Sequence, residues 1–193
     1  MDYEYDFFLS YPSRAAAGQW VLNHFYPVLK EELESLDPDP TVFCWTENEV
    51  GSVWPERIKR AHARSRLLIA VLTPPYFYKS PWCRAEWATM IQRQKDAGLG
   101  VSEDESLICP VLYSDGETYP DEVKKISFFD FRKWANPDSV FRSTADFVQF
   151  RHKVREFAEV ILRRRSLAPP WSDTWPVLEP DVLPPPRVPL PRL

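Results

Sequence analysis

Leu-Leu-Ile-Ala-Val-Leu-Thr, residues 67–73, is the most apolar run in the chain. Its apolar side chains do not alternate with polar ones, as they would in a strand with one face in water. An unbroken aliphatic run of this length is typical of a strand that is buried on both faces, and such strands occur mainly in parallel sheets. Residues 67–73 therefore predict the central strand of a parallel sheet.

Strand and helix patterns alternate on both sides of this run. Tyr-Asp-Phe-Phe-Leu-Ser-Tyr at residues 5–11 indicates a buried first strand, which Pro12 ends. Further strands are predicted at residues 41–46, 107–112 and 128–132, and helices at residues 15–36, 55–66, 81–97, 121–126 and 144–165. This alternation predicts an α/β fold, a flavodoxin-like three-layer sandwich with a five-stranded parallel sheet and helices on both faces. Any ligand site is then expected at the carboxyl edge of the strands.

Prolines give local detail to these helices. Pro55 and the pair Ser80-Pro81 stand at predicted helix starts, where proline loses no needed hydrogen bond and serine caps the first turn. Pro27 lies inside the helix predicted for residues 15–36, where a missing N–H disturbs the hydrogen-bond ladder. We therefore expect a bend near Pro27.

Composition bounds the class of protein. The chain has 193 residues, of which 44% are hydrophobic and 27% charged, so it can bury the core of one globular domain. No apolar run reaches the ~18 residues of a membrane span, and the acidic start Met-Asp-Tyr-Glu-Tyr-Asp is unlike a signal peptide, so we expect a cytoplasmic protein. A net charge of −4 with scattered basic residues argues against partners such as nucleic acid or an anionic membrane.

Prolines concentrate near the C-terminus. The chain contains 20 prolines, and nine of them fall between Pro169 and Pro191. We therefore divide the chain into a folded domain at residues 1–167 and a proline-rich, extended tail at residues 168–193, suited to docking or spacing. Trp171 and Trp175 leave open a second interpretation, in which the tail folds back and the body covers the two indoles.

Candidate site residues follow the predicted strand ends. Ser10, Tyr11 and Arg14 follow the first strand, Trp45 and Glu47 the second, and Tyr76 with the helix from residue 81 the third. Because the carboxyl ends of parallel strands share one edge, these side chains are expected to converge on one cleft.

Glu86 is the unusual member of that helix. Trp82, Glu86 and Met90 are spaced by four, so a carboxylate shares a helix face with an indole and a thioether. A desolvated carboxylate pairs with a cation, shifts its pKa upward or waits for a positive ligand. The spacing leaves open three cases: a functional site, an ion pair with Arg14 or Arg57, or a helix edge at which Glu86 reaches water.

The sequence lacks the motifs of several common enzyme classes. The sequence has no glycine-rich phosphate loop, no Gly-x-Ser-x-Gly and no His-Glu-x-x-His, which argues against an ATPase, a serine hydrolase and a zinc protease. The three cysteines, Cys44, Cys83 and Cys109, are far apart and lie among apolar neighbours, and there is no Cys-x-x-Cys, so reduced buried thiols are expected and no disulfide or metal site. The basic run at residues 163–165 ends a helix, where it complements the helix dipole.

The order of these pieces resembles the TIR (Toll/interleukin-1 receptor) domain family, and in particular its bacterial immune-effector branch. Four segments carry the resemblance: residues 5–11, the loop at residues 47–54 with Gly51, the central strand at residues 67–73, and Tyr-Phe-Tyr-Lys-Ser-Pro-Trp-Cys-Arg-Ala-Glu at residues 76–86. The last is the most specific, because it looks like the family's Ser-x-Trp-Cys-x-x-Glu box. The resemblance as a whole covers roughly residues 3–165.

The resemblance implies an NAD+ nucleosidase or cyclase that releases nicotinamide and gives ADP-ribose or a cyclic variant. Glu86 becomes the catalytic residue, without cofactor or metal, and NAD+ is the substrate. The residues that would border the nucleotide are Phe8, Ser10, Tyr11, Arg14, Trp45, Glu47, Tyr76 and Trp82.

The family resemblance also implies partners. It points to self-association through TIR–TIR contacts, in which the loop at residues 47–54 completes a neighbour's site, to activation by a partner protein or an upstream sensor, and to a role in antiviral innate immunity. Two alternatives stay open: a non-catalytic TIR adaptor that signals by homotypic assembly, and a domain that senses NAD derivatives without cleaving them.

Overall fold

Five parallel strands form one sheet in the computed structural model, which describes residues 2–14, 16–45, 54–100, 105–114 and 116–180. The strand order is β2-β1-β3-β4-β5, and each neighbouring pair is parallel. The strands are β1 (Tyr5–Ser10), β2 (Val42–Cys44), β3 (Ser65–Leu72), β4 (Ile108–Leu112) and β5 (Phe129–Asp130). All five predicted strands are therefore found, with ends shifted by a few residues.

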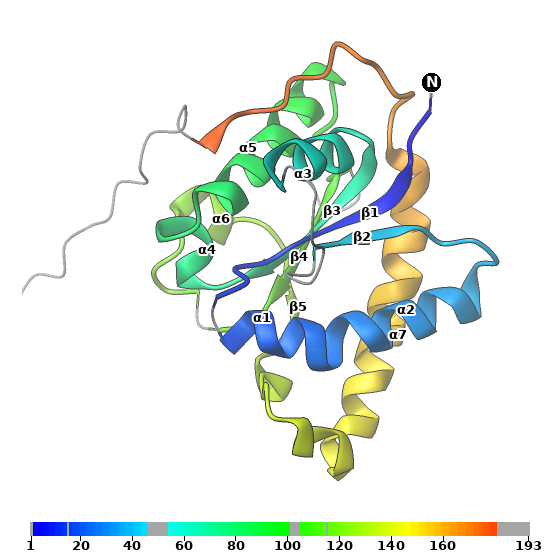
Figure 1. Cartoon of the computed structure of the whole chain (residues 1–193), viewed down its shortest axis with the longest axis vertical. Helices are drawn as coiled ribbons and strands as arrows, with labels where there is room; N and C mark the ends of the chain where they lie inside the picture. Colours follow the sequence, from blue (N-terminus) through cyan, green and yellow to red (C-terminus); the bar gives the residue numbers. More distant parts are fainter. Residues whose placement is uncertain (1, 15, 46–53, 101–104, 115, 181–193) are drawn as a thin grey trace, which may run out of the picture.

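Helices cover both faces of the sheet (Figure 1). One face carries α1, α2 and α7, and the other carries α3 and α5. The α-helices are α1 (Ala16–Trp20), α2 (Tyr26–Leu36), α3 (Trp54–Ala63), α4 (Pro74–Tyr78), α5 (Pro81–Asp96), α6 (Asp121–Lys124) and α7 (Ala145–Arg164). This confirms the predicted α/β, flavodoxin-like three-layer fold. Among the described helices, none has the length and apolar character needed to cross a membrane.

The central strand is the most deeply buried element. In β3 every residue from Leu67 to Leu72 has no exposed surface. Its neighbours are β1 and β4, so both of its edges are hydrogen-bonded as well. Burial on both faces explains why the sequence of this strand is continuously apolar.

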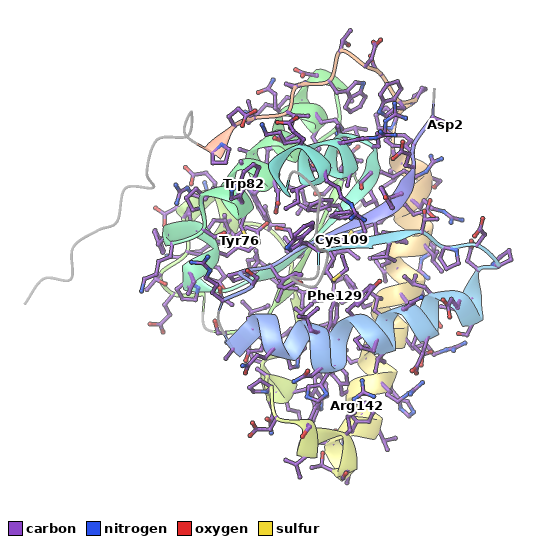
Figure 2. The ribbon with its side chains drawn as sticks, in the orientation of Figure 1. Asp2, Tyr76, Trp82, Cys109, Phe129 and Arg142 are labelled. Atoms are coloured by element: carbon purple, nitrogen blue, oxygen red, sulfur yellow. The ribbon has the colours of Figure 1, made fainter. Side chains whose placement is uncertain are left out.

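A π-helical turn at Val21–Phe25 stands where a bend was expected near Pro27. Pro27 lacks the N–H that a regular α-helix would direct to the carbonyl of Asn23. The Arg142 guanidinium takes that place, since its Nε and Nη2 donate to the Asn23 oxygen at 3.0 and 2.6 Å. Figure 2 shows Arg142 beside the α1–α2 segment. The wider turn and a distant arginine together satisfy the backbone that proline leaves unpaired.

The described part of the tail crosses α3 and α5, on the opposite face from α7 (Figure 1). We call residues 171–179 the strap. Trp171 Nε1 donates to the Ala63 oxygen at 3.2 Å, and the Leu178 N–H donates to Thr89 Oγ1 at 2.9 Å. An ion pair of 2.6 Å joins the Glu179 carboxylate to Lys59. The body thus covers the start of the tail, as the second interpretation of the sequence proposed.

The strap also covers a buried arginine. Arg93 on α5 has no exposed surface, and its guanidinium donates to the Ser65 oxygen at 2.7 Å and the Ala63 oxygen at 3.2 Å. Desolvation lowers its pKa to about 10. The Trp175 ring lies 4.7 Å from Arg93 Cζ and closes the site. Carbonyl dipoles and an aromatic face thus stabilise this buried cation, and the contact with Trp175 joins the strap to α5.

Replacing Trp175 by alanine should lower the free energy of unfolding by about 2 kcal/mol, because it removes the ring over a desolvated cation. Trp175→Phe should retain most of the stability, since a smaller ring still stacks. Urea unfolding measures both variants against Val140→Ala, a change at a side chain that is 63% exposed. A Trp175→Ala protein no less stable than Val140→Ala would show that the strap does not stabilise the fold.

Candidate functional site

A cleft of about 870 Å³ opens at the carboxyl end of β1, beside the first turns of α5. A second hollow of about 530 Å³ lies against β5 and α7, and none of its lining side chains is buried. The larger cleft lies where the topology of a parallel sheet predicts a ligand site. Its lining residues are Phe8, Leu9, Ser10, Tyr11, Pro12, Ser13, Arg14, Trp45, Ile58, Pro75, Lys79, Ser80, Pro81, Trp82, Cys83 and Glu86.

The start of α5 places Glu86 in this cleft. Ser80 caps the helix, because its Oγ accepts from the Cys83 N–H at 3.4 Å, and Pro81 occupies the first turn. Trp82 and Glu86 then follow one turn apart on the side that lines the cleft. Figure 2 shows Trp82 at this end of the molecule, near Tyr76. Glu86 is 8% exposed, so it meets the cleft while most of its surface is covered.

A chain of hydroxyl groups holds the Glu86 carboxylate. Ser10 Oγ donates to Glu86 Oε2 at 2.5 Å, and the Tyr76 hydroxyl lies 2.8 Å from the same Ser10 oxygen. The short helix α4, absent from the sequence prediction, brings Tyr76 there. Thr73 caps α4 by accepting from the Tyr76 N–H at 3.2 Å, which turns the tyrosine inward until none of its surface is exposed.

Glu86 has no cationic partner in the part of the chain that the structure describes. Among the described residues, no lysine, arginine or histidine forms an ion pair with its carboxylate, so the alternative of a pair with Arg14 or Arg57 is not found. Desolvation raises the pKa of Glu86 to about 8, and the hydrogen bond from Ser10 lowers it only in part. The carboxyl group is therefore mostly protonated at neutral pH until something positive approaches it.

Aromatic side chains form the floor and walls of the cleft. Phe8 is almost wholly buried at the floor, where its ring stacks on Phe43 at 5.2 Å between centroids. The Tyr11 hydroxyl donates to the Trp45 carbonyl, which joins the ends of β1 and β2. Trp82 stands on α5, with Lys59 Nζ 6.0 Å from its ring centroid. Such walls exclude water and can stack on a flat ring.

Seven of the nine predicted site residues line this cleft: Phe8, Ser10, Tyr11, Arg14, Trp45, Trp82 and Glu86. Tyr76 lies behind Ser10 and does not line the cleft. Glu47 and residues 47–53 of the predicted loop lie outside the described residues. The structure adds Lys79, an exposed cation at the rim of the cleft. The sequence signal that could have indicated it is its position directly before Ser80, the cap of the helix that carries Glu86.

Comparisons with known proteins give one family match and similar solved structures. The family model described as "TIR domain" matches residues 7–144. A similar solved structure is that of the TIR domains in the activated Roq1 resistosome, which directly recognizes the pathogen effector XopQ. It is 22% identical to this chain, covers 84% of each chain and has a TM-score of 0.37. A search among curated proteins finds no match.

The buried carboxyl group should make stability depend on pH. Folded Glu86 keeps its proton to about pH 8, whereas in the unfolded chain it loses the proton near its ordinary pKa of 4.5. The unfolded state binds fewer protons between these values, so the free energy of unfolding falls as pH rises through this window. We expect a fall of about 2 kcal/mol from about pH 6.5 to about pH 8, and a much smaller fall for Glu86→Gln.

Urea unfolding at several pH values measures this difference. Burial lowers the pKa of His62 from 6.5 to about 3, so its contribution changes mainly below pH 6.5 and affects the unchanged protein and both variants alike. Glu34→Gln, at an exposed carboxylate paired with Lys30, is the matched control. Parallel pH profiles for Glu86→Gln and the control would contradict the assignment.

Proposed function

Because this chain belongs to the TIR domain family, we propose that it is an enzyme that cleaves the bond between nicotinamide and ribose in NAD+. One observation carries the proposal: the Glu86 carboxyl group is buried, opens on the cleft and forms no ion pair with the described residues. A carboxyl group so placed is costly to ionise alone and gains most from a positively charged ligand. NAD+ carries that charge on its nicotinamide ring.

The chemistry needs one carboxylate. When the bond from the ribose carbon to the nicotinamide nitrogen breaks, its electron pair goes to the nitrogen, and nicotinamide leaves as a neutral molecule without a proton. Positive charge then develops on the ribose, where the Glu86 carboxylate stabilises it as carboxylates do in glycosidases. Water adds to the sugar, loses a proton and gives ADP-ribose. Attack by a ribose hydroxyl or by the adenine gives a cyclic product.

The rest of the cleft suits the rest of the dinucleotide. Its volume of about 870 Å³ falls within the range of small-molecule sites. Trp82, Tyr11 and Trp45 offer rings for stacking, and Arg14 and Lys79 supply positive charge at the rim for the diphosphate. Positive charge at the rim and a carboxyl group inside match the polarity of NAD+, which is negative at the diphosphate and positive at the nicotinamide.

Replacing Glu86 should stop the reaction. We expect Glu86→Gln to lower the rate of nicotinamide release by roughly 10²-fold or more, because a neutral amide cannot stabilise the charge on the ribose. Chromatography of NAD+ reaction mixtures measures nicotinamide and shows whether ADP-ribose or a cyclic product accompanies it. Glu34→Gln, which keeps the cleft intact, should react like the unchanged protein.

The same assay separates the alternatives. If neither the unchanged protein nor Glu86→Gln releases nicotinamide, even in assembled samples, the non-catalytic adaptor is the function that remains. If an NAD derivative binds but is not converted, the domain that senses NAD derivatives remains.

Self-association belongs to this proposal. The loop at residues 47–54 follows Trp45, which lines the cleft, so a neighbouring copy of the chain could complete the site through it. We expect the rate per molecule to rise with protein concentration, and light scattering to show assembly over the same range. Equal rates per molecule in strictly monomeric samples would contradict this. Activation by a partner or sensor, and a role in bacterial antiviral defence, are proposed on the family resemblance alone.

A further inference from the structure

Tyr76 is a buried ionisable group that the proposed reaction does not use and that lies next to the Glu86 site. It has no exposed surface, does not line the cleft, and yet its hydroxyl lies 2.8 Å from Ser10 Oγ. Its ring is fixed between Phe77 and Trp87, at 5.1 and 6.4 Å between centroids. Tyr76 is therefore linked to Glu86 through Ser10, although it does not reach the cleft itself.

When Glu86 is ionised, the hydroxyl chain has one direction. Ser10 has one hydrogen, and it donates this hydrogen to Glu86 Oε2, so its oxygen is left to accept from Tyr76. In this direction every donor of the chain has an acceptor, and the chain ends on a charged oxygen. Hydrogen bonds that end on a charge are the strong ones, and linked bonds polarise each other. The arrangement therefore favours the ionised form of Glu86.

We propose that Ser10 and Tyr76 act as positioning residues that hold Glu86 ready to lose its proton when a cationic nicotinamide enters the cleft. When Glu86 is protonated, its hydroxyl donates to Ser10, Ser10 donates to Tyr76, and the Tyr76 hydrogen loses its place in the chain. When the cation arrives, the proton passes to water in the cleft and both hydroxyls rotate to donate toward the carboxylate. This inference deepens the proposed function and rests on it for the identity of the cation.

The other titratable groups near Glu86 do not supply this effect. Cys83 lies on α5 itself, and burial raises its pKa, so it stays a neutral thiol. Tyr11 at the end of β1 donates to the Trp45 carbonyl instead. Arg14 and Lys79 line the same cleft from the loop after β1 and the end of α4, and neither forms an ion pair with Glu86. Among these groups, the hydrogen bonds of Ser10 and Tyr76 are thus the ones that stabilise the ionised carboxylate.

A titration of Glu86 in the full chain tests the proposal without relying on activity. With ¹³C-labelled glutamate, the carboxyl resonance that disappears in Glu86→Gln reports the Glu86 pKa between about pH 5 and about pH 10. We expect Tyr76→Phe to raise this pKa by about 0.5 to 1 unit, because it removes the last donor of the chain. Ser10→Ala should raise it by about 1 to 2 units, because it removes the donor that contacts the carboxylate.

Tyr78→Phe is the matched control. Its hydroxyl donates to the Thr118 carbonyl, outside the chain, so the same chemical change there should leave the pKa of Glu86 where it was. An unchanged midpoint in Tyr76→Phe would overturn the proposal and leave Tyr76 as a packing residue. If Tyr76→Phe does not fold, Ser10→Ala decides by the same criterion.

Activity provides a second readout. The pH profile of nicotinamide release should move to higher pH in Tyr76→Phe by the shift seen in the titration, whereas a purely structural role would lower the rate at every pH alike. If the unchanged protein releases no nicotinamide, the proposed function fails. The ¹³C titration still decides whether the hydroxyl chain sets the pKa of Glu86.

Discussion

A strand buried on both faces cannot be covered by helices on one side of a sheet. Residues 67–72 of β3 expose no surface, which requires helices on both faces. Parallel pairing adds a second constraint, because each connection must cross a face and return to the same starting edge. The carboxyl ends of the strands then lie together. For this reason Ser10 at the end of β1 reaches Glu86 on α5, while Thr73 after β3 caps α4 and so places Tyr76 beside Ser10.

Arg93 and Glu86 are both buried ionisable groups on α5, but their surroundings differ. Arg93 lies seven residues, or two turns, after Glu86, and carbonyl oxygens and the Trp175 ring enclose it completely. Glu86 has one serine donor and an open side that faces the cleft. The enclosed charge joins α5 to the end of α3, the start of β3 and the strap. The open one is costly to ionise, because desolvation raises its pKa to about 8, and strongly shifted groups in clefts are candidates for functional sites.

The fold and part of the site could be predicted because their signals are local. The apolar run at residues 67–73, the Ser80 cap and the spacing of Trp82 and Glu86 each depend on neighbours in the sequence. Contacts from side chains to distant groups could not be predicted in this way. Arg142 donates to the Asn23 carbonyl, 119 residues away in the sequence, and no periodic pattern in the sequence predicts such a pair. The position of Tyr76 behind Ser10 likewise depends on how α4 turns, which the sequence alone did not reveal.

The strap leaves α7 but is fastened to the opposite face of the sheet. Leu178 bonds Thr89, one turn from Glu86, and Glu179 bonds Lys59 on α3. A mechanical load applied beyond residue 180 would therefore be borne by these two bonds before it reached α7. Any molecule tethered at that point, whether a surface, a bead or another protein, would pull first on α3 through Glu179 and next, through Leu178, on α5, which carries the buried carboxyl group.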